Sequence, residues 1–274
     1  MSKGFLVLAQ NSEVDYIRQA YALALSIKST QPTINNISLV TNDIVPEQYV
    51  SAFDKIIPIP FGDAANSSKW KIENRWKLYH ASPYDETIVL DVDMLILDNI
   101  EQAWQYVNSK DLFFTSYVTD YKNRTVTDTT YRKMFVENDL PNLYSGMYYF
   151  KKSDTVLEFF KLAEFITYNW ERIYSIVAPK NMQNFYSFDV TVSIAAKLLG
   201  IDDIITHKNS PFTFTHLKPA LQGWDPIPQS CLSQLLINFT DSKELYLNNF
   251  RQHNVFHYVE DGFLTDEIIE KLNV

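Results

Sequence analysis

Two aspartates, Asp91 and Asp93, interrupt the apolar run TIVLDVDMLIL at residues 87–97. If this run forms a strand, both side chains point to the same face, because successive residues of a strand alternate. Two like charges side by side on a buried surface repel each other and lose hydration, so they require a compensating group. Carboxylate oxygens are preferred ligands of Mg²⁺ and Mn²⁺, which often share their shell with substrate phosphates. The pair therefore predicts a divalent-cation site that could hold a diphosphate.

The elements that precede this pair predict an α/β fold. Residues 4–10 and 35–43 read as buried strands on either side of a helix at 15–30, and residues 55–60 suggest a third short strand. Continuous apolar strands separated by helices are typical of a parallel sheet that is covered by helices. In open sheets of this kind ligands bind at the carboxyl ends of the strands, which is where the two aspartates are expected.

The remaining pattern extends this fold to the end of the chain. Residues 118–142 are polar without a clear period and are interpreted as an insertion or lid. The other expected elements are a helix at 71–82, a helix at 99–107 capped by Asp98, strands at 111–117 and 143–154, helices at 155–174 and 187–201, strand-like pieces at 211–219 and 254–261, and a helix at 265–272. We expect a single domain over residues 1–274, with a nucleotide-binding half (4–117) and an acceptor-side half with a C-terminal appendix (143–274).

Composition excludes several classes of function. The 274 residues are 46% hydrophobic and carry a net charge of −9, which argues against nucleic acid as the main partner. A single cysteine, Cys231, excludes an intrachain disulfide framework and a cysteine zinc site. No apolar run reaches the length of a membrane span, and the short apolar stretch at the N-terminus reads as a first strand. A soluble, cytoplasmic protein without an integral membrane segment is expected.

The segment ETIVLDVDMLILDNI, residues 86–100, resembles the Asp-x-Asp segment of GT-A-fold glycosyltransferases. It is most similar to that of the glycogenin and lipopolysaccharide galactosyltransferase family of retaining enzymes, and the order of elements is similar over residues 4–200. The resemblance implies a GT-A fold, with a mixed, mostly parallel sheet flanked by helices. It also implies that Asp91 and Asp93 hold Mn²⁺ or Mg²⁺ on the diphosphate of a nucleotide sugar, with a UDP-sugar as the expected donor. The acceptor would be a hydroxyl of a glycan, a lipid-linked sugar or a protein.

The same resemblance assigns the donor contacts. Ala9, Asn11 and Tyr16 fall near the family's nucleotide contacts, and Val92 lies between the two metal-binding aspartates. Arg75 matches the arginine upstream of the Asp-x-Asp strand, which implies a catalytic position near the donor phosphates or sugar.

Two later segments match less closely. Ser145 and Gly146 correspond to the strand beneath the donor sugar, where Tyr144 replaces the family's asparagine and leaves the sugar undetermined. Asp189 corresponds to a catalytic acidic residue near the sugar or the acceptor. A simple helix N-cap is the alternative interpretation of Asp189.

The third metal ligand of the family is a histidine near the C-terminus, followed by glycine, lysine, proline and tryptophan. No segment here carries the whole motif. His257 is favoured because it ends the last strand, and His216 is the alternative. With His257 as ligand, His216 and Lys218 would instead face the diphosphate or the acceptor.

The predicted function is a metal-dependent glycosyltransferase, with retention of configuration implied by the resemblance. An inverting enzyme that uses Asp189 as its base stays open. One alternative is a non-catalytic carbohydrate-binding or assembly module on the same fold. Another is a sugar-1-phosphate nucleotidyltransferase, which is disfavoured because residues 9–16, AQNSEVDY, carry no glycine for a phosphate-binding loop.

Overall fold

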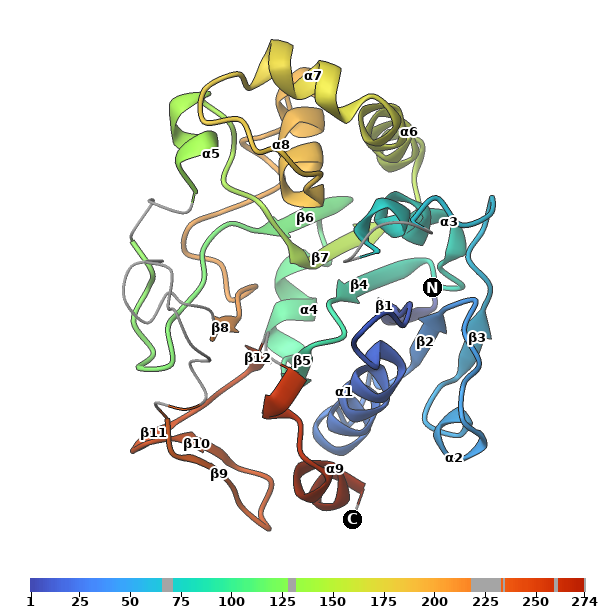
Figure 1. The fold of residues 1–274 in the computed structure, drawn as a ribbon, viewed down its shortest axis with the longest axis vertical. Helices are drawn as coiled ribbons and strands as arrows, with labels where there is room; N and C mark the ends of the chain where they lie inside the picture. Colours follow the sequence, from blue (N-terminus) through green and yellow to red (C-terminus); the bar gives the residue numbers. More distant parts are fainter. Residues whose placement is uncertain (66–70, 128–131, 218–232, 234, 259–260, 274) are drawn as a thin grey trace.

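The protein is described from a computed structural model that covers residues 1–274, except 66–70, 128–131, 218–232, 234, 259–260 and 274. A six-stranded sheet in the order β3-β2-β1-β4-β7-β6 forms its centre (Figure 1). All of these strands run in one direction except β7, which is antiparallel to both neighbours. The strands are β1 (Lys3–Leu8), β2 (Ile37–Val40), β3 (Lys55–Ile57), β4 (Glu86–Leu90), β6 (Leu112–Thr115) and β7 (Tyr144–Lys151). The predicted mixed, mostly parallel α/β fold is confirmed.

Helices cover both faces of this sheet. Phe5 and Val7 of β1 pack into the apolar core on the side of α1 (Tyr16–Thr30) and α4 (Glu101–Val107), whereas Leu6 packs into the core on the opposite side. This alternation is the period-two pattern of a strand that is buried on both faces. The opposite core is covered by η1 (Ile72–Lys77), α3 (Leu78–Ala81), α6 (Asp154–Tyr168), α7 (Trp170–Val177) and α8 (Phe188–Leu199).

The expected strand at 87–97 is two strands in two different sheets. Leu90 ends β4 in the central sheet, and β5 (Met94–Ile96) belongs to a small sheet with the order β5-β12-β8. The backbone N–H of Asp91 still donates to the Gly146 carbonyl of β7 at 2.8 Å, after which the chain turns. The two aspartates therefore come together through a turn, and the expected alternation along one strand is wrong.

Three helical predictions also need correction. The first half of the expected helix at 71–82 is the 3₁₀ helix η1. The expected helix at 155–174 breaks at Asn169, whose side chain donates to the Phe165 carbonyl at 2.8 Å and so competes with helix continuation. Asp98 does not cap α4. Its carboxylate accepts from the Asn254 N–H at 3.0 Å, which ties it to the turn before β12.

The C-terminal part contains more strand than the sequence indicates. Besides β8 (Thr215–His216) and β12 (Val255–His257), a second small sheet is formed by β9 (Ile237–Phe239), β10 (Leu245–Leu247) and β11 (Phe250–Arg251). The small 3₁₀ helix η5 (Asp261–Phe263) and α9 (Asp266–Asn273) follow, and α9 packs beside α1 (Figure 1). Lys218 and Cys231 lie outside the described residues.

The polar segment 118–142 contains α5 (Lys133–Glu137), and a further short helix, α2 (Glu47–Val50), lies between β2 and β3. Val118, Met134 and Phe135 are buried, so much of the described part of the segment packs against the body of the protein. Across the described residues, no helix combines the length and the apolar character that crossing a membrane requires.

Candidate metal and donor site

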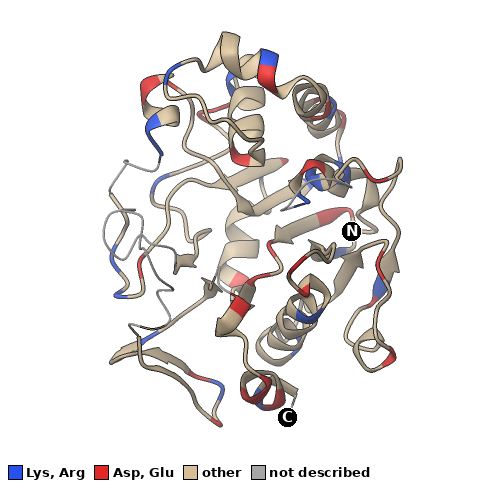
Figure 2. Cartoon of the chain, in the orientation of Figure 1, with Lys and Arg blue, Asp and Glu red and all other residues tan. Residues whose placement is uncertain are grey.

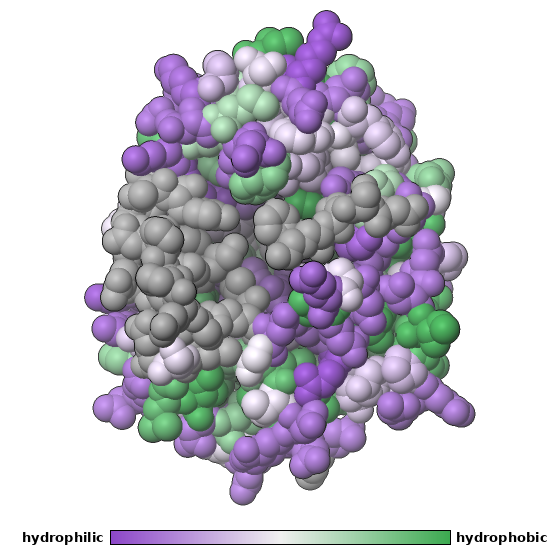
Figure 3. Space-filling model, viewed as in Figure 1, coloured by the Kyte–Doolittle hydropathy of each residue, from purple (hydrophilic) through white to green (hydrophobic). Residues whose placement is uncertain are grey.

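A cleft of about 620 Å³ opens at the carboxyl ends of β1 and β4. This volume lies within the range of about 300–1,000 Å³ that small-molecule sites occupy. Acidic residues gather at the turn that follows β4 (Figure 2), and hydrophilic side chains predominate over the described surface of this face (Figure 3). The predicted site residues that line the cleft are Tyr16, Arg75, Asp91, Val92, Asp93, Ser145, Asp189 and His257.

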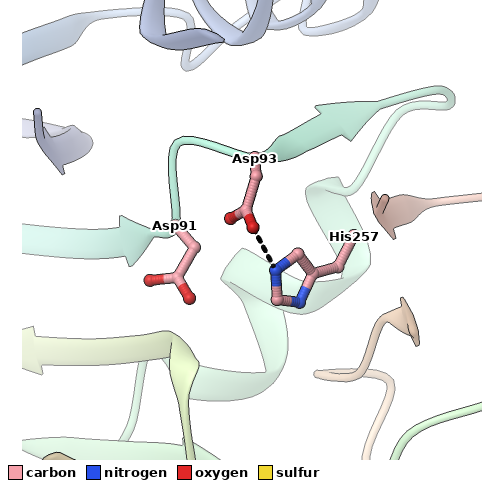
Figure 4. A group of neighbouring side chains, drawn as sticks. All are labelled: Asp91, Asp93 and His257. Carbon is pink, nitrogen blue, oxygen red and sulfur yellow. Dashed lines mark ion pairs between the residues drawn. The ribbon is translucent and has the colours of Figure 1, made fainter. Parts of the chain in front are cut away.

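Asp91, Asp93 and His257 line this cleft and lie close together (Figure 4). Each offers one ligand atom, and these atoms lie within 4.8 Å of one another. Asp91 follows β4, Asp93 precedes β5, and His257 ends β12, so the three side chains come from two different sheets. Nε2 of His257 lies 2.9 Å from Oδ2 of Asp93.

The donor set fits a divalent cation. Two carboxylates and one imidazole match the oxygen and nitrogen ligands that Mn²⁺ accepts, and the ligand atoms are near enough to share one ion. Burial raises the pKa of Asp91 above its ordinary value, although Arg75 opposes this shift. Burial would also raise the pKa of Asp93, but the charge and hydrogen bond of His257 outweigh it and hold that pKa low. The two carboxylates are thus in different electrostatic environments.

Arg75 connects Asp91 to β7, the strand beside β4 in the central sheet. Its Nη2 donates to Oδ1 of Asp91, and its Nη1 donates to Oγ of Ser145 at 3.1 Å. The 3₁₀ helix η1 that carries Arg75 is held by the buried side chain of Asn74. Asn74 donates to Gln10 at 2.7 Å and to Asp63 at 2.6 Å. The guanidinium therefore reaches the aspartate from a well-supported backbone.

Gly146 permits the close approach of β7 to Asp91. A Cβ atom at this position would lie 3.1 Å from Oδ2 of Asp91 and 3.1 Å from Cε of Met94. Gly146 does not itself line the cleft. The close approach that the sequence indicates is therefore directed at a carboxylate of the site.

Asp189 lies in the first turn of α8, where the N-cap residue is Ser187. The alternative interpretation of Asp189 as the N-cap is therefore wrong. Its Oδ1 accepts from the N–H of Ser145 at 2.8 Å and from Oγ of Ser145 at 2.6 Å. Burial would raise the pKa of Asp189, but the neighbouring Arg132 and the hydrogen bonds from Ser145 bring it below its ordinary value.

Arg132 is a contributor that the sequence reasoning missed. Its Nη1 donates to Oδ2 of Asp189 at 2.6 Å, and only 5% of its side chain is exposed. It lies in the polar segment 118–142, whose lack of periodicity gives no local indication of burial.

The two candidate histidines are neighbours. His216 stacks on His257 with ring centroids 4.6 Å apart and an interplanar angle of 14°. It does not line the cleft and does not belong to the cation-binding group. Its contact with His257 places it behind the candidate ligand, while Lys218 cannot be compared because it lies outside the described residues.

The expected nucleotide contacts at the first strand divide into two groups. Tyr16 lines the cleft, and burial together with the nearby carboxylates of Asp93 and Asp261 raises its pKa to about 12. Ala9 and Asn11 do not line the cleft. Ala9 is buried in the core. Asn11 accepts from the N–H of Ile17 at 3.0 Å and so supports the start of α1.

Several further lining residues were not predicted. Most of them lie in loops, where neither periodicity nor a motif distinguishes them. They include Gln10, Glu13, Lys71, Phe185, Tyr186 and Asp261. Asp261 follows His257 closely enough in sequence that proximity to the candidate ligand could have indicated it.

Comparison with solved structures places this geometry on a known fold. The galactosyltransferase LgtC, crystallised with donor and acceptor sugar analogs, matches with a TM-score of 0.53 and 12% identity, over 98% of this chain and 95% of that one. The chain has the GT-A fold. Mouse xyloside xylosyltransferase 1 matches with a TM-score of 0.53 and 12% identity, over 94% of this chain and 97% of that one. The expected resemblance to GT-A-type glycosyltransferases is thus confirmed at the level of fold.

Other comparisons add less. The glycosyltransferase GlyE of Streptococcus pneumoniae TIGR4 matches with a TM-score of 0.45 and 14% identity, over 95% of this chain. The chain spans 55% of the length of that protein. No protein-family model matches the sequence. No curated protein matches it either.

Proposed function

We propose that this protein is a metal-dependent glycosyltransferase that moves a sugar from a nucleotide diphosphate sugar to a hydroxyl acceptor. The observation that carries the proposal is the convergence of Asp91, Asp93 and His257 on a ligand-sized cleft of a GT-A fold. A bound Mn²⁺ or Mg²⁺ would neutralise negative charge on the donor diphosphate and on the departing nucleotide. A UDP-sugar is the proposed donor, and a glycan, lipid-linked or protein hydroxyl is the proposed acceptor.

In this proposal the residues of the site have different roles. Asp91, Asp93 and His257 hold the cation, and Arg75 orients Asp91 beside the diphosphate. Ser145 and Asp189 face the cleft from β7 and α8, where they would contact the donor sugar. Both oxygens of Asp189 already accept hydrogen bonds from the protein, which makes it a poor base. This supports transfer with retention over an inverting reaction that would need such a base.

The test is hydrolysis of a panel of nucleotide sugars by the wild type, with and without Mn²⁺. Metal-dependent release of one nucleotide is expected, with at least about a 100-fold loss in Asp93→Asn. Asp111→Asn is the matched control, because Asp111 is exposed and lies outside the cleft. Turnover that survives metal removal would overturn the proposal.

The same samples separate the alternative functions. A carbohydrate-binding module without activity predicts glycan binding but no nucleotide release by any variant. A nucleotidyltransferase predicts that sugar 1-phosphate and a nucleoside triphosphate form a nucleotide sugar and release pyrophosphate. Calorimetry with Mn²⁺ alone shows whether the cation site exists when no donor in the panel is turned over.

A further inference from the structure

We infer that Arg132 is a positioning residue of the donor site, which fixes Asp189 and, through Ser145 and Arg75, the carboxylate of Asp91. The inference about catalysis rests on the proposed function. The structural part concerns only how these four side chains hold one another in place.

All three nitrogen atoms of the Arg132 guanidinium donate hydrogen bonds within the protein. Its Nε donates to Oδ1 of Asn142 at 2.7 Å, and its Nη2 donates to the Leu143 carbonyl. Its flat faces lie over two aromatic rings, with the guanidinium carbon 3.8 Å from the centroid of Phe135 and 4.2 Å from that of Tyr144. The planar fork of arginine suits this arrangement because one rigid group meets several acceptors and two ring faces at once.

The third nitrogen of the Arg132 guanidinium donates to a residue that lines the cleft. Nη1 of Arg132 donates to Oδ2 of Asp189 at 2.6 Å, and Ser145 donates twice to the other oxygen. The hydroxyl of Ser145 in turn accepts from Arg75, whose second Nη atom donates to Asp91. The contacts form one continuous path from the segment before β7 to the candidate metal ligand.

Charge alternates along this path in the order Arg132, Asp189, Arg75, Asp91. Each of these charges is at least partly buried and has an opposite charge beside it, which offsets the cost of removing it from water. Arg132 is the end of the path farthest from the ligand atoms, and its side chain is less exposed than that of Asp189, 5% against 23%. Without Arg132, a partly buried carboxylate would lose its nearest cation.

A carboxylate held by three donors from the protein is restricted in position and stabilised in its ionised form. Arg132 therefore makes Asp189 a fixed hydrogen-bond acceptor at the cleft and opposes its use as a proton acceptor. The path also explains why a polar segment without periodicity is packed against the site.

The test compares Arg132→Lys and Arg132→Met with Asp189→Asn and with the double variant Arg132→Lys/Asp189→Asn. Lysine keeps the charge and the fold but cannot meet Asn142, Leu143 and Asp189 together. We expect about a 100-fold lower rate of Mn²⁺-dependent donor hydrolysis in Arg132→Lys. In the Asp189→Asn background the same change should cost less than threefold. A full additional loss there would show that Arg132 does not act through Asp189 and would overturn the inference.

A matched control separates positioning from stability. Tyr149 lies on β7, as Ser145 does, but toward the end away from the cleft, and Tyr149→Phe removes its buried hydrogen bond to Glu86 of β4. It should lower the unfolding midpoint without lowering the hydrolysis rate. If Arg132→Lys and Tyr149→Phe reduce hydrolysis to the same extent at equal loss of stability, Arg132 is merely structural.

A second readout does not depend on activity. The amide proton of Ser145, which donates to Asp189, should change its NMR chemical shift in Arg132→Lys and keep it in Tyr149→Phe. An unchanged shift in Arg132→Lys would overturn the positioning role. Because this measurement needs no donor, it remains decisive even if the wild type turns over no nucleotide sugar and the proposed function fails.

Discussion

Nε2 of His257 and Oδ2 of Asp93 lie 2.9 Å apart and join β12, the middle strand of a small sheet, to the turn after β4. This contact brings the imidazole to the two carboxylates, although the strands involved are far apart in sequence. Behind it, His216 stacks on His257 at 4.6 Å between centroids. The two histidines therefore have different relationships to the site, one within the candidate ligand set and one packed against it.

Removing the imidazole of His257 should strongly weaken binding of the cation. Since even residues that only orient ligands cost about 10–100-fold in metal affinity, His257→Ala should lower Mn²⁺ affinity by about 100-fold or more. His216→Phe keeps the ring contact and should change that affinity by less than about tenfold. Calorimetric titration with Mn²⁺ measures both. The ring of His253 lies on Asp98 outside the cleft, so His253→Ala serves as the control. A larger loss in His216→Phe than in His257→Ala would reverse the assignment.

Gly146→Ala should disturb Asp91 directly. The added methyl group would lie 3.1 Å from Oδ2 of Asp91, so the carboxylate or the strand must shift. Overpacking of this kind costs about 1–3 kcal/mol in unfolding free energy. We expect a loss in that range, together with weaker Mn²⁺ binding. Urea unfolding and calorimetry measure the two effects, and Met147→Leu on the same strand should leave Mn²⁺ binding intact. Unchanged Mn²⁺ affinity in a folded Gly146→Ala protein would contradict the close approach of β7 to the Asp91 carboxylate.

Arg75→Lys should retain charge but lose function. A lysine cannot reach Asp91 and Ser145 at once, as the two Nη atoms of Arg75 do. Misplacement of a positioning group by about 1 Å can cost about 100-fold in rate, and a loss of this size is expected in donor hydrolysis. Arg124→Lys, at an exposed arginine that pairs with Asp120 outside the cleft, should have no effect on hydrolysis. Wild-type rates of donor hydrolysis in Arg75→Lys would show that the forked guanidinium of Arg75 is not required.

Asp63 should make stability depend on pH. Burial would raise its pKa, but hydrogen bonds from Asn74, Ala65 and Gln10 and the charge of Lys71 bring it below its ordinary value. A lowered folded-state pKa contributes stability above the unfolded value of about 3.9, and this contribution disappears as pH falls through the folded value. The excess unfolding free energy of the wild type over Asp63→Asn should therefore be constant near neutral pH and shrink in acid.

Urea unfolding at pH 7, 5 and 3 measures this difference. Asp241→Asn is the control, because the carboxylate of Asp241 is almost fully exposed. An advantage of the wild type over Asp63→Asn that grows as pH falls would have the wrong sign and would refute the explanation.

The sequence predicts the site best where a candidate residue directly follows or ends a regular strand. The apolar run before Asp91 predicts a buried strand, and polar residues directly after such a strand predict a site at the sheet edge. Both expectations agree with the cleft. The place of His257 at the end of the last strand favours it as the third ligand, and it lies with Asp91 and Asp93 in the structure.

The parts that sequence reasoning missed depend on contacts between distant segments. Arg132 has no distinguishing neighbours in the sequence, and its hydrogen-bond partners are Asn142, Leu143 and Asp189. The break between β4 and β5 is likewise not encoded in the apolar run. It follows from β12, which pairs with β5 in a sheet of its own. Local pattern cannot anticipate such pairing, because the period-two signal is the same in either sheet.

The two-sheet origin of the ligand set has a consequence for biosynthesis. Asp91 and Asp93 emerge from the ribosome long before His257, which lies on β12. A nascent chain can build the central sheet and still lack the third ligand until β12 pairs with β5. Assembly of the three-residue cation site is therefore completed only after β12 has been synthesised and has paired with β5.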